Sequence, residues 1–246
     1  MGQATKHAYG EVAQIVRQRI DSAKDRLWRF DDFRDLPSQA VAQVLSRLAR
    51  QGSLERLSKG TYYRPRQTAF GKSLPNPSEM KKLATKRSSV FPSGLPAANL
   101  LGFTTQTAQR NEVATSSSSL PRKLIGQDTL VRPRRPTAWE QLSQADAALL
   151  DFLRQGGQNS ELTPEDTVHR TLALASEPGR FERLLKVAAT EPPRVRALLG
   201  AIGESLGKRP SILMPLRTSL NPLSRFDFGA LSRLPKAQRW QAKKPQ

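Results

Sequence analysis

Residues 36–66, LPSQAVAQVLSRLARQGSLERLSKGTYYRPR, limit the possible folds of this chain more than any other segment. They combine an amphipathic helical pattern, a strong helix stop and a short basic segment with the pattern of a hairpin. Four apolar residues recur at the spacing of one helical face: Val41, Val44, Leu45 and Leu48. This spacing predicts a helix over residues 39–51.

The residues at both ends of this helix fit its boundaries. Ser38 can act as the N-cap, because its hydroxyl can accept a hydrogen bond from the first turn. Gly52 follows the helix as the residue that most readily takes a positive φ. A short strand between Leu54 and Leu57, a turn at 58–60 and a second strand at Thr61–Tyr63 then predict a basic hairpin.

The preceding segment supplies the remaining elements of a small domain. A first helix is expected over 11–22, with its inward face formed by Val12, Ile15, Val16 and Ile20. An extended piece at 27–30 follows, and Asp31 or Asp32 can cap a short second helix. Pro37 then forces the chain to turn. The order helix, strand, helix, turn, helix, hairpin is that of a winged helix-turn-helix.

In such a domain the polar side of the third helix would enter the major groove of DNA. That side is Gln39, Gln43, Ser46, Arg47 and Arg50. Glutamine pairs well with adenine and arginine with guanine, so Gln39, Gln43 and Arg47 are the predicted base readers. Ser38 is expected to hold a phosphate, and the predicted hairpin contacts are Arg56, Lys59, Arg64 and Arg66. The same polar stripe is also what an ordinary solvated helix face looks like.

The charge of the chain favours a polyanionic partner. It carries 40 basic and 21 acidic residues, a formal net charge of +19. Nucleic acid is the leading candidate, with an anionic membrane surface or an acidic protein as the others. Residues 1–66 hold +6 of this charge, so the remainder is basic too. The absence of cysteine excludes thiol chemistry, and with no apolar run of membrane-spanning length we expect a cytoplasmic protein.

The middle of the chain is less regular. A linker is expected at 67–78, followed by a basic helix that begins after Ser78. Short extended pieces at 111–115 and 129–132 and a helix of a turn or two at 97–101 indicate a small β-containing unit. The run RPRRP at 132–136 could lie on a phosphate backbone, face an acidic partner, or be a solvated loop.

From Trp139 the pattern becomes helical. Four helices are expected: one that stops at Gly156 and Gly157, one capped by Thr163, one around Phe181–Ala188 and one around Val195–Ile202. The end is expected to be irregular, with frayed last residues. We therefore expect an α+β, mainly helical protein with three parts: a winged helix-turn-helix at 1–68, a linker helix and small α/β region at 69–138, and a C-terminal helical region with a basic tail at 139–246.

No sequence pattern of a known active site is present. The chain has two histidines, His7 and His169, far apart in sequence, and it lacks a nucleophile elbow and a phosphate-binding glycine loop. A metal-dependent nuclease would need clustered carboxylates, and Asp146, Asp151, Glu161 and Asp166 have no special spacing. We expect a protein that is not an enzyme and that uses no cofactor or metal.

Two blocks carry a resemblance to a known family: FDDFRDLPSQAVAQVLSRLARQGSLERLSKGTYYRPR, and FPSGLPAANLLGFTTQ with the β-containing piece after it. Over about residues 10–135 the chain resembles the AbiEi-type antitoxins, transcriptional regulators of type IV abortive-infection toxin–antitoxin pairs. The resemblance implies an autorepressor that binds operator repeats, with Ser38, Gln39, Gln43 and Arg47 on the recognition helix and Arg56, Lys59 and Arg64 on the wing. It also implies a nucleotidyltransferase toxin as partner, although the helical stretch after Trp139 exceeds the shorter members.

Two functions therefore remain open. The first is a DNA-binding autorepressor that is also an antitoxin. The second is a sequence-nonspecific nucleic-acid binding or processing protein without a toxin partner.

Overall fold

The computed structural model describes residues 2–23, 26–68, 71–73, 75–76 and 89–244. The basic helix expected after Ser78 lies outside these residues. The fold is α+β, with helices and small sheets. The chain forms two compact units, which we treat separately: unit 1 is Met1–Arg87 with Leu120–Gln127, and unit 2 is Ser88–Ser119 with Asp128–Gln246.

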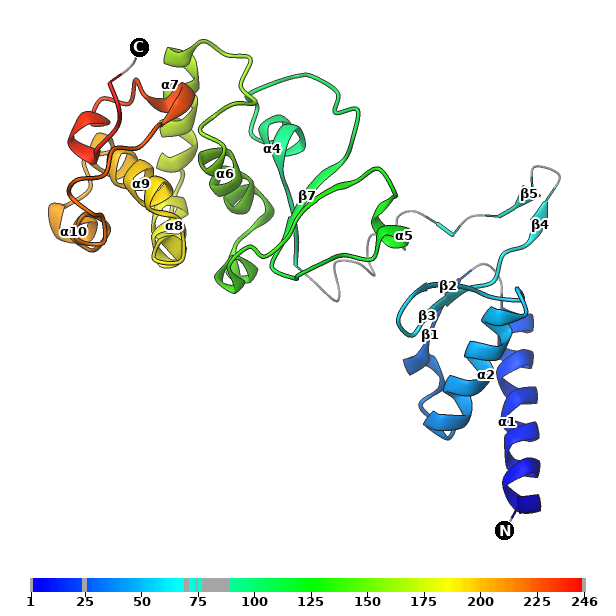
Figure 1. Ribbon diagram of the computed structural model, residues 1–246. Helices are drawn as coiled ribbons and strands as arrows, with labels where there is room; N and C mark the ends of the chain where they lie inside the picture. Colours follow the sequence, from blue (N-terminus) through cyan, green and yellow to red (C-terminus); the bar gives the residue numbers. More distant parts are fainter. Residues whose placement is uncertain (1, 24–25, 69–70, 74, 77–88, 245–246) are drawn as a thin grey trace. The chain divides into compact units, whose positions relative to one another are not determined.

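Unit 1 begins with the element order that the sequence predicts. It runs α1 (Gly2–Ser22), β1 (Leu27–Arg29), the 3₁₀ helix η1 (Phe30–Phe33), α2 (Ser38–Arg50), β2 (Glu55–Ser58) and β3 (Thr61–Tyr63) (Figure 1). The three strands form an antiparallel sheet in the order β1–β3–β2. Two details differ from expectation: α1 begins well before residue 11, and the short second helix is a 3₁₀ turn.

The inner face of this sheet and the helices share one core. The four apolar residues of α2 are all buried, with at most 6% of each exposed. Val16 of α1 and Trp28 of β1 pack in the same cluster, and Trp28 stacks on Phe33 with 5.4 Å between the ring centres. Burial of this face fixes α2 with its polar side outward, since a helix buries only one stripe.

The sequence prediction is confirmed at the C-terminal end of α2 and is wrong at its N-terminal end. Gly52 takes a φ of +75°, and the amides of Gly52 and Ser53 donate to the carbonyls of Ala49 and Leu48. This is the Schellman pattern that ends a helix on a glycine. At the other end, Ser38 is not the N-cap. Pro37 holds that position without a side-chain hydrogen bond, because the helix begins one residue earlier than the sequence suggested.

The outer face of the same sheet is also apolar, and a later segment covers it. Leu57 and Tyr63 are buried there against Ile125 of α5 (Arg122–Ile125). Lys123 of α5 pairs with Glu55 at 2.9 Å. A segment from the β-containing region of the sequence thus belongs to unit 1. A small hairpin, β4 (Gln67–Thr68) with β5 (Gly71–Lys72), follows the sheet.

Unit 2 combines a second small sheet with the C-terminal helices. Its sheet has the order β6–β7–β8, with β6 (Val90–Pro92) antiparallel and β8 (Leu130–Arg132) parallel to β7 (Glu112–Thr115). Helix α4 (Gly94–Leu100) packs between this sheet and α6. The remaining helices are η2 (Thr137–Gln141), α6 (Gln144–Arg154), α7 (Pro164–Ser176), α8 (Arg180–Ala188), α9 (Pro193–Ser205) and α10 (Pro210–Thr218) (Figure 1).

One hydrophobic core runs through all of unit 2. Phe91, Leu101 and Phe103 belong to the same buried cluster as the helices from α6 onward, and Phe103 stacks on Phe152 at 3.8 Å. The structure therefore divides the chain differently from the expected boundary at 138–139. Neither the β-containing piece nor the helices could bury its apolar surface without the other, so the two form one unit.

The four expected helices after Trp139 are present as α6 to α9, but the end of the chain differs from expectation. Helix α10 was not expected, and two 3₁₀ turns follow it: η3 (Gly229–Leu231) and η4 (Gln238–Trp240). Trp240 and Ala242 are buried, and Ala242 pairs with Phe226 in a β-bridge. The end of the chain is thus packed through Lys243 and not frayed there. Gly200 on α9 permits this packing, since a Cβ at that position would lie 2.1 Å from the Trp240 ring.

Candidate nucleic-acid interface

The outward side of α2 presents the polar stripe that the sequence predicts. Gln39, Gln43, Ser46, Arg47 and Arg50 are all exposed, and α2 contains no acidic residue. Ser38 is exposed as the first residue of the helix. The structure thus places the six predicted helix residues on α2, and the side chains of all six are exposed to solvent.

The hairpin residues fall into two groups. Arg56 on β2, Lys59 at the turn and Arg66 after β3 are exposed. Arg64 instead packs back on α1: it pairs with Asp21 at 3.0 Å and donates to the carbonyls of Ile20 and Asp21. Three of the four predicted hairpin residues are therefore exposed, whereas the fourth anchors the C-terminal end of α1.

Some basic residues of unit 1 form an ion pair with an acidic residue, and others do not. The acidic residues flanking α2 and the hairpin are all paired, in the pairs Asp21–Arg64, Asp31–Arg34, Asp32–Arg26, Asp35–Arg19 and Glu55–Lys123. The hydrogen bond from Arg19 lowers the pKa of Asp35. Arg47, Arg50 and Arg56 make no ion pair or side-chain hydrogen bond within the described part of the chain.

The two units share the net charge unequally. Unit 1 has 20 basic and 8 acidic residues, a net charge of +12. Unit 2 has 20 basic and 13 acidic residues, a net charge of +7, although it contains many more residues. The sequence as far as Arg66 accounts for only half of the charge of unit 1, because the basic segments at 67–87 and 120–127 add the rest.

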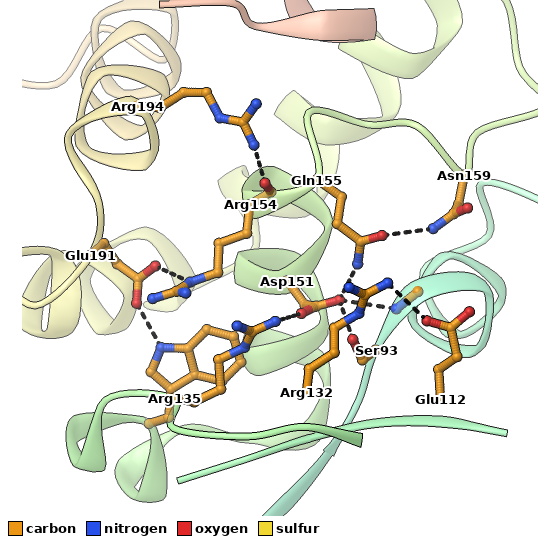
Figure 2. Close-up of polar contacts among 12 residues, drawn as sticks. Ser93, Glu112, Arg132, Arg135, Asp151, Arg154, Gln155, Asn159, Glu191 and Arg194 are labelled. Atoms are coloured by element: carbon orange, nitrogen blue, oxygen red, sulfur yellow. Dashed lines mark hydrogen bonds and ion pairs between the residues drawn. The ribbon is translucent and has the colours of Figure 1, made fainter. Parts of the chain in front are cut away.

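Unit 2 contains a buried network of carboxylates and guanidinium groups (Figure 2). The carboxylate of Asp151 accepts hydrogen bonds from the Ser93 hydroxyl at 2.8 Å, the Gly94 amide at 3.0 Å and Arg135 at 2.8 Å. Gln155 donates to the same group. The side chain of Asp151 is fully buried. This carboxylate links α6, the start of α4 and the segment after β8.

A second buried carboxylate, Glu191, lies in the same network. It accepts from the indole of Trp139 at 2.7 Å and from Arg154 at 2.7 Å (Figure 2). Arg135 and Arg154 both lie over the Trp139 ring, at 5.5 and 5.4 Å from its centre. Each oxygen of the two carboxylates accepts at least one hydrogen bond, which is the arrangement expected of a structural network.

The arginines of the RPRRP run turn mainly inward. Arg132 pairs with Glu112 at 3.1 Å, and Arg135 with Asp151. Arg134 is exposed and takes a φ of +58°. The run is therefore neither a plain solvated loop nor a uniform basic strip, because two of its three guanidinium groups neutralise acids of unit 2.

The four carboxylates considered for a nuclease serve different partners. Asp146 is buried against Arg180 and Arg183, Glu161 accepts from the loop at 104–106, and Asp166 hydrogen-bonds to the N-cap Thr163. No cluster of three or more metal-ligating residues occurs in the part of the chain that the structure describes. His169 is exposed on α7, and the side chain of His7 lies outside the described residues.

Sequence reasoning missed the features that depend on distant partners. The arginine partners of Asp146 and Asp151 lie 16 to 37 residues away, so local spacing does not reveal them. The one available signal was that acidic residues occur inside apolar helical segments, where a charge requires a partner.

Comparisons with known proteins give a family match of limited extent. Residues 14–132, a little less than half of the chain, match a family of unknown function (DUF6088). No match was found among curated proteins. The crystal structure of the RV2827C protein from Mycobacterium tuberculosis matches with a TM-score of 0.41 at 16% identity, covering 91% of this chain and 86% of that chain. No helix among the described residues is both long and apolar enough to cross a membrane.

Proposed function

We propose that unit 1 is a winged helix-turn-helix that binds double-stranded DNA. In this proposal α2 lies in the major groove, with Gln39, Gln43 and Arg47 near base edges. Arg56, Lys59 and Arg66 of the hairpin region contact the backbone. The element order and the β1–β3–β2 sheet support this interpretation, since they place an exposed helix beside a basic hairpin.

The observation that carries the proposal is the pairing of charges in unit 1. A face that was merely solvated would be expected to mix acidic and basic residues or to pair them. Here the acids around α2 and the hairpin are neutralised by basic residues outside α2, which leaves Arg47, Arg50 and Arg56 without a partner among the described residues. Positive charge in that state attracts phosphate and releases counterions on binding.

We further propose that the protein represses its own operon and acts as the antitoxin of a type IV toxin–antitoxin pair, in the cytoplasm. This part rests on the resemblance to the AbiEi-type antitoxins. The partner would be a nucleotidyltransferase-type toxin. A nucleotidyltransferase gene beside the gene of this protein, and rescue of growth from that toxin by this protein, would support the antitoxin role.

The DNA-binding proposal is tested by mobility shift of the full chain at two salt concentrations. The probes are the upstream region of its own gene, a scrambled duplex of equal length and an RNA of the same sequence. We expect preferential binding to the upstream duplex. Arg47→Ala should weaken this binding by about 1–3 kcal/mol, and Gln43→Ala by a similar amount, while binding to the scrambled duplex changes less.

Arg34→Ala is the matched control. Arg34 is an exposed arginine of the same unit, but it pairs with Asp31 and lies outside α2. The variant should bind as the unaltered protein does. Equal affinity for the upstream and scrambled duplexes would contradict specific repression and favour the alternative, a nonspecific nucleic-acid binder. Equal losses in the Arg34→Ala and Arg47→Ala variants would contradict the assignment to α2.

A further inference from the structure

Unit 2 has a small surface cavity where α9, α10 and η4 meet. Its volume is about 140 Å³. Its apolar walls come from Pro210, Leu213, Met214 and Trp240. Met214 is half exposed, whereas Trp240 is almost completely buried. Helix α10 packs against α9 at the edge of the helical part of unit 2 (Figure 1).

The rim of this cavity is cationic. Arg217 lies over the Trp240 ring at 4.5 Å from its centre, and the side chains of Arg217 and Arg239 are 47% and 65% exposed. Both guanidinium groups share one carboxylate, that of Glu204, which also accepts from the indole of Trp240 at 2.7 Å. The two guanidinium groups carry two positive charges against the single negative charge of Glu204, which leaves a net positive charge at the rim.

The neighbouring charges do not cancel this excess. Lys208 pairs with Glu182, so the Glu182 carboxylate is already neutralised and does not offset the charge of Arg217 and Arg239. The hydrogen bond from Lys208 lowers the pKa of Glu182. Arg209 is exposed, and its side chain forms no ion pair with a carboxylate among the described residues. The cavity therefore joins an apolar interior to a rim that lacks an available acid.

We propose that this cavity, which we call the α10 pocket, binds an acidic segment of a partner protein. An apolar side chain of the segment enters between Met214 and Trp240, and flanking carboxylates meet Arg217 and Arg239. Arginine forms directed pairs with carboxylates, and methionine adapts its shape to an inserted side chain. Arginine and tryptophan are enriched among the residues that contribute most to binding at protein interfaces. The proposal does not depend on DNA binding by unit 1.

The test is fluorescence anisotropy with the full chain and three labelled peptides. The first peptide has glutamates around a single leucine, the second replaces the glutamates with glutamine, and the third replaces the leucine with alanine. We expect binding of the first peptide, and binding of the other two that is weaker by about tenfold, because the second lacks the carboxylates and the third lacks the anchor.

Protein variants separate the α10 pocket from the general basicity of the chain. Met214→Asp and Arg239→Ala should each weaken binding of the first peptide by about tenfold. Arg225→Ala is the matched control, since Arg225 is exposed and, within the described ranges, its side chain donates only to the nearby backbone carbonyls of Pro222 and Ser224. Thermal unfolding of each variant checks that unit 2 remains folded.

Four results would overturn the proposal. One is equal binding of the glutamate and glutamine peptides. Another is unchanged binding by Met214→Asp, or loss of peptide binding in an Arg47→Ala/Arg50→Ala variant, which would place the peptide on unit 1. The last is self-association of the protein that Met214→Asp abolishes, because a second copy would then occupy the α10 pocket. Failure of DNA binding alone would leave the proposal intact.

Discussion

Replacement of Asp151 by alanine is the sharpest test of whether the buried network of unit 2 is structural. Asp151 is fully buried and accepts four hydrogen bonds, from Ser93, Gly94, Arg135 and Gln155. Its removal leaves the charge of Arg135, of which only 14% of the side chain is exposed, without its carboxylate partner. Burial already lowers the pKa of Arg135, and Asp151 is the main group that opposes this shift.

The expected loss of stability in Asp151→Ala follows from the interactions that the carboxylate makes. Removing one partner of a buried ion pair costs about 3–5 kcal/mol. At about 2–4 °C per kcal/mol for a unit of this size, the midpoint of thermal unfolding should fall by about 6–20 °C. Far-UV circular dichroism is the appropriate assay, because helices α6 to α10 all belong to unit 2.

Glu165→Ala is the matched control for this experiment. Glu165 also pairs with an arginine, Arg233, but both side chains are 58% exposed. An exposed pair contributes about 0–1 kcal/mol, so the control should unfold almost as the unaltered protein does. If Asp151→Ala were as stable as the control, or more stable, the network would not be structural. A functional role for the Asp151 carboxylate would then have to be considered, since functional groups often reduce stability.

Two further predictions concern charge. Arg50→Ala should reduce the slope of log affinity against log salt for DNA by about 0.9, the share of one phosphate contact, and Arg34→Ala should leave the slope unchanged. For Asp146, burial raises the pKa, but the hydrogen bonds from Arg183, Ser143 and Arg180 outweigh it and the pKa is lowered. The stability that Asp146 contributes is therefore present above its unfolded pKa of about 3.9 and is lost as the pH falls through the lower folded value. Urea unfolding at a series of pH values should show this loss, and Asp146→Asn should lack its share; an identical pH dependence in the variant would contradict the assignment.

Local patterns were sufficient for most of unit 1. The apolar period of α2, the stop at Gly52 and the two short strands all depend on residues close together in sequence, and the structure agrees with each. The start of α2 differed because Ser38 and Pro37 both suit a helix start, as cap and as rigid entry. The role of Arg64 differed because its partner, Asp21, lies 43 residues earlier.

Long-range packing explains what the sequence did not reveal. Leu57 and Tyr63 alternate with inward residues, which signals a sheet with two apolar faces. Nothing near them indicates that the second face is covered by Ile125 of α5, more than 60 residues later. In unit 2 the sequence likewise gave no sign of the distant packing partners of Phe91 and Trp240, each of which packs into a core formed mainly by other elements.

The position of α5 also changes the interpretation of the charge. From the sequence alone, the predicted winged helix holds less than a third of the net charge, which indicated that the remainder of the chain is also basic and could contact the polyanion. Once the segments at 67–87 and 120–127 are counted with it, unit 1 holds +12 of +19. The attraction to a polyanion is therefore greatest in the unit that presents α2 and the hairpin. This concentration makes unit 2 the less basic part, whose acids are largely committed to internal pairs. We therefore expect a partner of unit 2 to be recognised through a local site, such as the proposed α10 pocket, rather than through overall charge.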